Sequence, residues 1–269
     1  MFNCLGHASS SRAIYGRHVV LDQNPRKALL FEPDGWTWCL SNPETRQLLR
    51  EIRQELMELC GEGEYFHLGF DEAYSHATCD LCRDKDGATI LAEYLNEVTE
   101  ELAQVGRRPI IWGDALLDQT QWSRPNIATS RPDQRTHEAL DGLNRSIIIA
   151  DWQYNIVEGK VPTSEHFREK GIATLLCPWH DNQYINTLGL EAQRMKAYGL
   201  LATTWHTLQN HITLIPRAGE VAWSDRENKD QFTSTTGIMR TYAASLQRKL
   251  VPIEGDYKAA GWHSKEVEM

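Results

Sequence analysis

A repeated unit constrains the fold of this 269-residue chain more than any other feature of its sequence. Short apolar runs end in polar or aromatic residues at 109–114, 147–152, 174–179 and 200–205, and the run that starts at Glu64 has the same form. Their length and their enrichment in β-branched residues predict buried strands. Residues 1–6 have the character of a further strand, so we count six in all.

Amphipathic segments lie between the predicted strands. Leu49, Ile52 and Leu56 recur at helical spacing after the capping sequence that begins at Ser41, and Gly61 ends this helix. Further helices are predicted at 88–105, 163–170 and 188–198, whereas 9–40 and 118–143 have the composition of irregular loops.

Alternation of buried strands with amphipathic helices predicts a parallel sheet with helices outside it, and therefore an α/β protein of the (β/α)8 TIM-barrel type. Because six strands are counted where a full barrel has eight, we expect the first two strand-helix units to be missing before Met1. No linker or low-complexity tract divides residues 1–269, so we expect one partial barrel domain.

The net charge and the distribution of apolar residues limit which partners and which cellular locations we expect. The formal net charge of −9 disfavours nucleic acid and anionic membranes, which would repel the chain. No apolar run approaches the roughly 20 residues that span a bilayer, and the amino terminus lacks the pattern of a signal peptide. We therefore expect a cytoplasmic protein. Cys4, Cys60 and Cys177 lie in or beside apolar stretches, as reduced core thiols do.

The strand that starts near Glu64 ends in two adjacent carboxylates, Asp71 and Glu72. Such a pair most often belongs to a solvated loop, but here it ends an apolar run and follows His67 closely. Adjacent residues of an extended segment point to opposite sides. We therefore expect the two acids to have different roles instead of sharing a proton.

The stretch from His67 to Glu72, His-Leu-Gly-Phe-Asp-Glu, resembles the His-x-Gly-Gly-Asp-Glu motif of glycoside hydrolase family 20, the β-N-acetylhexosaminidases, with Phe70 in place of the second glycine. Residues 2–8 resemble the segment that ends in Pro-Gly-His in the same family. The resemblance covers nearly the whole chain, from about the third strand of the family's barrel onward. The family's first-strand arginine and second-strand acidic residue have no counterpart.

The resemblance implies a carbohydrate substrate, no cofactor, and a mechanism in which the substrate's own acetamido oxygen is the nucleophile. Glu72 would be the general acid and base, and Asp71 would orient the acetamide group. Tyr154 is similar to the tyrosine that binds the acetamide carbonyl. The remaining candidate substrate-binding residues are His7, His67, Trp112, Asp114, Trp152, Trp179 and Trp205. The family's Trp-x-Glu at the last strand is replaced here by residues 205–207, Trp-His-Thr, which leaves the sugar preference open.

The residues that follow the acid pair suggest a separate possibility. His76, Cys79 and Cys82 have the spacing of half a zinc site, which a distant residue such as Cys39 would have to complete. The alternative is a loop with two reduced thiols.

Two other functions stay open at this point. A metal-dependent hydrolase on the same barrel could use several residues as zinc ligands: His7, His67, Asp71, Asp151, His180 and His206. A sugar-binding remnant without catalytic activity is the third interpretation. The sequence gives no indication of the oligomeric state.

Overall fold

The fold is described from a computed structural model of the chain. The structure describes residues 1–8, 24–156, 159–179, 181–205 and 214–223. All of these belong to one compact unit, Met1–Arg226, and a second unit, Glu227–Met269, lies outside the described residues.

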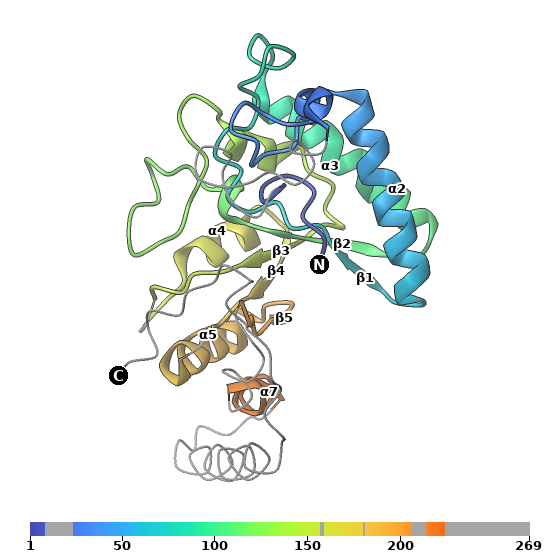
Figure 1. Cartoon of the computed structure of the whole chain (residues 1–269). Helices are drawn as coiled ribbons and strands as arrows, with labels where there is room; N and C mark the ends of the chain where they lie inside the picture. Colours follow the sequence, from blue (N-terminus) through green and yellow to red (C-terminus); the bar gives the residue numbers. More distant parts are fainter. Residues whose placement is uncertain (9–23, 157–158, 180, 206–213, 224–269) are drawn as a thin grey trace, which may run out of the picture. The chain divides into compact units, whose positions relative to one another are not determined.

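A parallel sheet of five strands forms the centre of this unit (Figure 1). The strands are β1 (Tyr65–His67), β2 (Arg108–Trp112), β3 (Ile148–Asp151), β4 (Ala173–Leu176) and β5 (Gly199–Leu200). Each strand pairs in parallel with the next one along the chain, so the spatial order is β1-β2-β3-β4-β5. The predicted parallel α/β sheet is thereby confirmed.

The expected first and last strands are less regular than predicted. Residues 1–6 are not a strand, although Phe2 and Cys4 donate backbone hydrogen bonds to the carbonyls of His67 and Leu68 at 3.0 and 2.8 Å. Only these two bonds form before the backbone approaches Asp71 at Gly6, so no ladder develops. The expected strand at 200–205 is reduced to the two residues of β5, but Leu201 continues to bond the carbonyl of Leu176.

The first helix begins at its predicted capping sequence, and the helices expected at 88–105 and 163–170 begin within one residue of their predicted starts. They are α2 (Pro43–Cys60), α3 (Gly87–Gln104), α4 (Pro162–Glu169), α5 (Asn182–Met195) and α7 (Leu214–Trp223). The side chain of Asn42 caps α2, and that of Asp86 caps α3. The helix expected at 188–198 starts earlier, because Asp181 accepts the Gln183 N–H at its amino end. None of the described helices is long and apolar enough to cross a bilayer.

Short 3-10 helices occur in both segments expected to be irregular and directly after β2. These are η1 (Pro25–Leu30), η2 (Asp114–Leu116) and η3 (Thr136–Gly142). Thr136 is held in place by donating to the carbonyl of Ala115 at 2.7 Å. The periodicity of an amphipathic α-helix does not detect such short elements, because they span only one or two turns.

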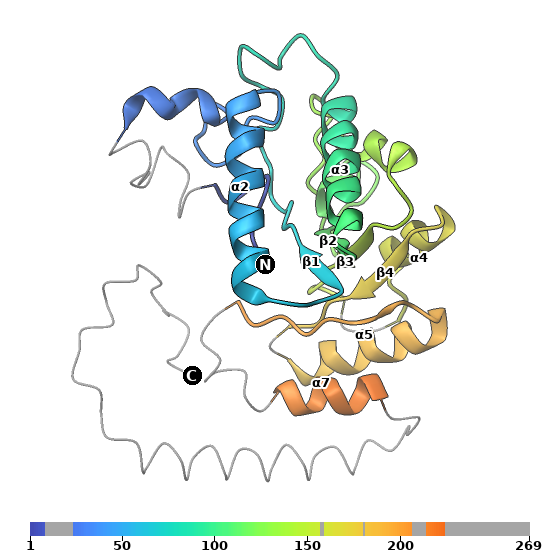
Figure 2. The same ribbon diagram turned by 90° about the vertical axis from the view of Figure 1, so that its right-hand side faces the viewer.

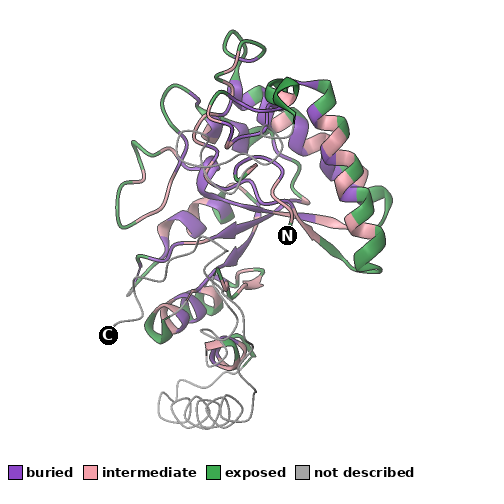
Figure 3. Cartoon of the chain, in the orientation of Figure 1, coloured by how far each residue is buried: buried purple, intermediate pink, exposed green. Residues whose placement is uncertain are grey.

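Strands β2, β3 and β4 are mostly buried (Figure 3), and the side chains on their two faces belong to different clusters. Ile111 and Ile149 belong to the main core cluster together with side chains of α3 and α4, such as Val98 and Phe167. The alternate residues of the same strands form a separate cluster, which contains Trp112, Ile148, Ala150, Leu175 and Cys177. This alternation is the pattern of a barrel wall, with one face toward the helices and one toward the interior.

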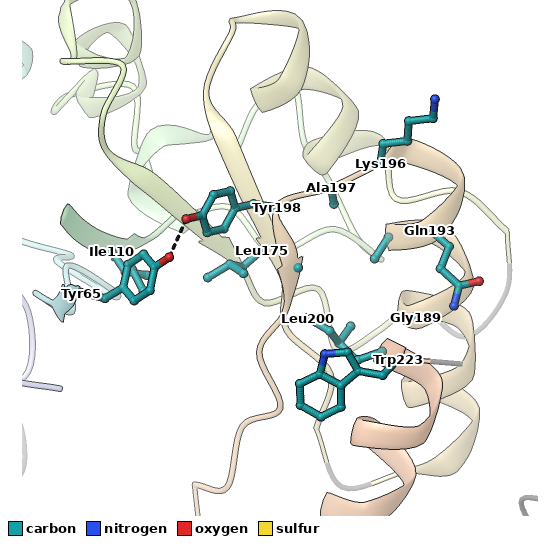
Figure 4. A pocket seen from close by; sticks show the side chains of 13 residues that line it. Tyr65, Ile110, Leu175, Gly189, Gln193, Lys196, Ala197, Tyr198, Leu200 and Trp223 are labelled. Atoms are coloured by element: carbon teal, nitrogen blue, oxygen red, sulfur yellow. Dashed lines mark hydrogen bonds between the residues drawn. The ribbon is translucent and has the colours of Figure 1, made fainter. Parts of the chain in front are cut away.

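The sheet is strongly curved. Tyr65 at the start of β1 and Tyr198 just before β5 form a hydrogen bond between their hydroxyls at 2.6 Å (Figure 4). Strands at the two edges of a flat five-stranded sheet would be roughly 19 Å apart. The contact therefore requires the sheet to bend into part of a barrel. At the β5 edge of the sheet, α5 and α7 lie against each other (Figure 2), and Gln193 donates to the carbonyl of Val221 at 2.9 Å.

All six cysteines are free thiols. Cys4 and Cys177 are buried, as expected, but the expectation that Cys60 is a core thiol is wrong, because its side chain is exposed. Cys60 is the last residue of α2, where the helix leaves the core before Gly61.

Candidate active site

The acid pair follows β1 in a sharply turned segment of backbone. Gly69, Phe70 and Glu72 have φ angles of 74°, 82° and 53°. The segment is therefore not extended, and the expectation that Asp71 and Glu72 point to opposite sides is wrong. His7 Nε2 lies 3.0 Å from Asp71 Oδ2 and 3.3 Å from Glu72 Oε2, so both carboxylates face the same imidazole.

Asp71 is buried and held by the amino-terminal segment. Its Oδ1 accepts a hydrogen bond from Asn3 Nδ2 at 2.5 Å. A side chain at Gly6 would place its Cβ 2.0 Å from the carbonyl oxygen of Asp71, and one at Gly69 would place its Cβ 2.5 Å from Asn3. Glycine at both positions lets the two segments approach closely enough for these contacts.

His7 carries a positive charge in this arrangement. Burial lowers the pKa of its imidazole, but the hydrogen bonds and the charges of Asp71 and Glu72 outweigh burial and raise the pKa to about 9. Its ring packs against Trp36 at 4.2 Å between centroids. Trp36 Nε1 in turn donates to the carbonyl oxygen of Glu72 at 2.9 Å. Trp36 therefore holds the backbone of Glu72 on its carbonyl side.

Asp114 holds the other side of Glu72. Its Oδ2 accepts the Glu72 N–H at 3.0 Å and the Thr129 hydroxyl at 2.7 Å, and its Oδ1 accepts Trp152 Nε1 at 2.9 Å. Asp114 is 1% exposed, and burial together with the charge of Asp71 raises the pKa of its carboxyl to about 7. Asp114 therefore holds the backbone of Glu72 and the indole of Trp152 in place.

Aromatic side chains from several strand ends form a connected group. Ring centroids lie 5.4 Å apart for Trp152 and Tyr154, 5.3 Å for Tyr154 and Trp179, and 5.2 Å for Trp112 and Trp205. Trp205 Nε1 donates to the Tyr154 hydroxyl at 2.6 Å, which joins the two halves of the group. Indole faces of this kind pack well against apolar faces of sugars.

His67 lies beneath this group. Its ring contacts Trp112 at 4.4 Å between centroids, and its Nδ1 accepts the N–H of Gly69 at 3.1 Å. Burial lowers the pKa of the imidazole to about 3. His67 is therefore neutral and supports the turn that carries the acid pair.

The structure thus brings together predicted residues from the ends of all five strands. Sequence reasoning missed Asn3, Trp36 and Thr129, each of which holds the acid pair or Asp114. Asn3 lies in the segment already singled out by its similarity to the Pro-Gly-His region, so its position offered a signal. Trp36 and Thr129 lie in segments expected to be irregular, where no sequence pattern marks them as part of the site.

Of the metal ligands considered for a hydrolase, His7 and Asp71 are in contact at the acid pair, but Asp151 does not join them. Asp151 accepts hydrogen bonds from Thr163 and Ser164 at 2.6 Å each, so its carboxylate faces the start of α4. His180 and His206 lie outside the described residues. Within the part of the chain that the structure describes, one group of side chains is arranged to hold a metal ion, and it contains none of these residues.

His76 is not part of that group. Its side chain is buried, and its Nε2 lies 2.9 Å from the carbonyl oxygen of Gly87. The expectation that His76 joins Cys79 and Cys82 as a ligand is therefore not supported.

A separate cavity of about 550 Å³ lies away from the acid pair (Figure 4). Tyr65, Leu175, Leu200 and Trp223 are among the residues that line it, and neither Asp71 nor Glu72 does. The cavity extends from the start of β1 to α5 and α7, whereas the acid pair follows the carboxyl end of β1.

Together, the curved parallel sheet, the helices on one face and the polar and aromatic residues at the strand ends define an α/β half-barrel of the TIM-barrel type. The chain belongs to glycosyl hydrolase family 20, because the model of that family's catalytic domain matches residues 2–233. Comparison with curated proteins found no match.

Solved structures share this fold at low sequence identity. A β-N-acetylhexosaminidase from Bacteroides fragilis NCTC 9343 is 14% identical with a TM-score of 0.58, over 85% of this chain and 51% of that one. An exo β-N-acetylglucosaminidase from Vibrio harveyi, solved with N-acetylglucosamine, is 13% identical with a TM-score of 0.55, over 86% of this chain and 41% of that one. This chain therefore spans about half the length of the structures it matches.

Proposed function

We propose that this chain carries the acid pair of a β-N-acetylhexosaminidase that removes terminal N-acetylhexosamine with retention of configuration. The observation that carries the proposal is the arrangement of Asp71 and Glu72 on one imidazole, that of His7, with Asp114 joining the backbone of Glu72 to Trp152 of the aromatic group. The titles of the B. fragilis and V. harveyi structures name the same class of activity.

In the proposed reaction, Glu72 donates a proton to the glycosidic oxygen as the bond to the leaving group breaks. The 2-acetamido oxygen attacks the anomeric carbon and forms an oxazolinium-like intermediate. Glu72, now a carboxylate, then removes a proton from the water that opens this intermediate. Its partly exposed side chain suits this exchange of protons better than a buried one.

Asp71 has the surroundings that the second role requires. Its buried carboxylate is fixed by Asn3 and His7, so it can accept the acetamide N–H and stabilise the developing positive charge without reorganising. A fixed anion in a water-poor site interacts more strongly with a cationic intermediate than it would in water.

Tyr154 is proposed to bind the acetamide carbonyl. The Thr203 hydroxyl donates to the Pro178 carbonyl at 3.0 Å, and Trp205 donates to the Tyr154 oxygen. The Tyr154 proton is therefore directed at Thr203 Oγ1, 2.9 Å away. In the proposed complex, the carbonyl oxygen of the acetamide takes the place of Thr203 as acceptor.

The experiment is the hydrolysis of p-nitrophenyl N-acetyl-β-D-glucosaminide by the wild-type chain and by Glu72→Gln. Loss of general acid-base catalysis is expected to lower kcat by roughly 10²- to 10⁴-fold. Glu62→Gln is the matched control, because Glu62 is an exposed carboxylate before β1, and it should leave kcat unchanged. Equal kcat in Glu72→Gln and the wild type would contradict the assignment, and binding of a thiazoline inhibitor without any turnover would favour a sugar-binding remnant.

A further inference from the structure

A group of three thiols and one carboxylate, from residues 32–39 and from the loop that follows the acid pair, takes no part in the proposed reaction. Cys39 Sγ lies 3.4 Å from Cys79 Sγ and 3.5 Å from Cys82 Sγ. Together with a carboxylate oxygen of Glu32, the three sulfur atoms all lie within 4.8 Å of one another. Glu32, Cys39 and Cys82 are at most 2% exposed, and Cys79 is partly buried, so protein surrounds most of the group.

The sulfur separations fit metal ligands better than a disulfide. A disulfide would bring two sulfur atoms to about 2.05 Å. Tetrahedral zinc with Zn–S bonds of about 2.3 Å places its sulfur ligands roughly 3.8 Å apart. Separations of 3.4 and 3.5 Å are close to this second value, and a small expansion would admit the ion.

The backbone around the cysteines forms a turn suited to such a site. The N–H groups of Cys82 and Arg83 both donate to the carbonyl of Cys79 at 2.9 Å. This tight turn brings the two thiols of the Cys-x-x-Cys sequence to the same side. The third thiol, Cys39, follows the bridge between Phe31 and Trp38, so the ligands come from two segments far apart in the sequence.

Glu32 is oriented to complete the set. Its Oε2 accepts the N–H groups of Thr78 and Cys79 at 3.0 and 2.7 Å, and its Oε1 accepts that of Ala77 at 3.2 Å. A carboxylate has about four lone-pair sites, so Oε1 retains one. No Lys, Arg or His side chain among the described residues pairs with this buried carboxylate, whose charge would therefore be compensated by a bound cation.

We propose that Cys39, Cys79, Cys82 and Glu32 bind one Zn²⁺ in a closed, tetrahedral structural site. Three soft thiolates and one oxygen favour zinc over magnesium or calcium, which prefer oxygen ligands. Binding forms three Zn–S bonds and one Zn–O bond, and the three thiol protons are released to solvent.

The site would connect the metal to the acid pair through the backbone. Trp36 lies between the ligands Glu32 and Cys39 in the sequence and donates to the Glu72 carbonyl. Cys79 and Cys82 lie in the loop that continues from Glu72. A bound ion would therefore fix both segments that hold Glu72, without touching the substrate.

The test is the metal content of the chain purified under reducing conditions without chelator, measured by plasma mass spectrometry. We expect one zinc per chain in the wild type and in Cys60→Ser, whose thiol is exposed and outside the group. Cys39→Ser and Cys82→Ser should lose the zinc. No zinc in the wild type, or the same zinc content in all four proteins, would overturn the proposal.

A second measurement does not depend on variants that fold. Cobalt added to the chelator-treated wild type should give a thiolate-to-metal charge-transfer band that saturates at one equivalent, with the band retained in Glu32→Gln at an affinity lower by roughly 10-fold or more. A wild-type chain that lacks this band, or that contains a disulfide between Cys39 and either other thiol under the same reducing conditions, would contradict the proposal.

Discussion

At the scale of single residues, His7 determines the electrostatics of the acid pair. The pKa of His7 in the folded chain is raised to about 9 from an ordinary value of 6.5. The folded state therefore binds this proton more tightly than the unfolded state does. Its contribution to stability is fully present below pH 6.5 and is lost as the pH rises through about 9.

The direction of this pH dependence can be measured. Urea unfolding of the wild type should show a free energy of unfolding that declines between about pH 6.5 and pH 9, whereas in His7→Gln this decline should be reduced. The difference between the two proteins, measured at matched ionic strength, isolates the contribution of the imidazole. Superimposable pH profiles would show that His7 is not held as a cation by Asp71 and Glu72.

Phe70 is the residue at which this chain departs from the family's second glycine. Its φ of 82° is unfavourable for a side chain, yet the ring is 1% exposed and packs against Tyr94 at 6.1 Å. Relief of backbone strain in Phe70→Gly should be worth about 1 to 2 kcal/mol. Loss of a buried phenyl ring costs about 3 to 5 kcal/mol.

We therefore expect Phe70→Gly to lower the free energy of unfolding by about 2 kcal/mol in denaturant titrations. Ala77→Gly is the matched control, since Ala77 also has a positive φ, of 60°, but loses only a methyl group. Its stability should change by less than about 1 kcal/mol. A Phe70→Gly variant more stable than the wild type would mean that strain outweighs packing at this turn.

The acid pair itself could be found from the sequence, because its motif combines an apolar run with two carboxylates. The orientation of the two side chains could not. It depends on positive φ angles at Phe70 and Glu72, which the sequence pattern of a strand does not predict. The supporting roles of Trp36 and Thr129 depend on contacts with residues 36 and 15 positions away in the sequence, and both residues lie in segments without a periodic pattern.

At the scale of elements, ion pairs connect α2 to α3. Arg53 Nη2 lies 2.7 Å from Glu101 Oε2, and the Arg53 side chain is only 3% exposed. Arg50 pairs with both Glu97 and Glu101 at 2.7 Å, but at an exposed position. Glu101, which pairs with the buried Arg53, can therefore be compared with Glu97 on the same helix, which pairs with the exposed Arg50.

Glu101→Gln should lower the free energy of unfolding by about 2 kcal/mol or more, because it leaves the buried Arg53 charge without its carboxylate partner. Glu97→Gln should change it by less than about 1 kcal/mol, as expected for exposed pairs. Denaturant titration of both variants measures the difference. An equal loss in the free energy of unfolding in the two variants would show that burial of Arg53 does not strengthen its ion pair with Glu101.

Element boundaries could be predicted where caps mark them. Asn42 and Gly61 delimit α2, and both were identifiable from the sequence. The start of α5 was placed too late, because its first turn is polar and its apolar periodicity begins only later. The amino-terminal segment runs alongside β1 but forms only two backbone hydrogen bonds with the residues at its end. Apolar composition alone does not distinguish such a segment from a regular strand.

At the scale of the whole molecule, the described residues form one curved wall of a barrel. The order of the strands and their parallel pairing followed from the alternation of strands and helices. The curvature is seen in the contact of Tyr65 with Tyr198, which no local pattern predicts because the residues are 133 positions apart. The expected cytoplasmic location and the absence of a nucleic-acid partner stay predictions.

The central claim is that the substrate's own acetamido group attacks the anomeric carbon while Asp71 orients it. The most direct measurement compares kcat/KM for p-nitrophenyl N-acetyl-β-D-glucosaminide with that for p-nitrophenyl β-D-glucoside, which lacks the acetamido group. An intramolecular nucleophile predicts a preference of at least roughly a thousandfold for the first substrate in the wild type. Comparable values for the two substrates would contradict the account.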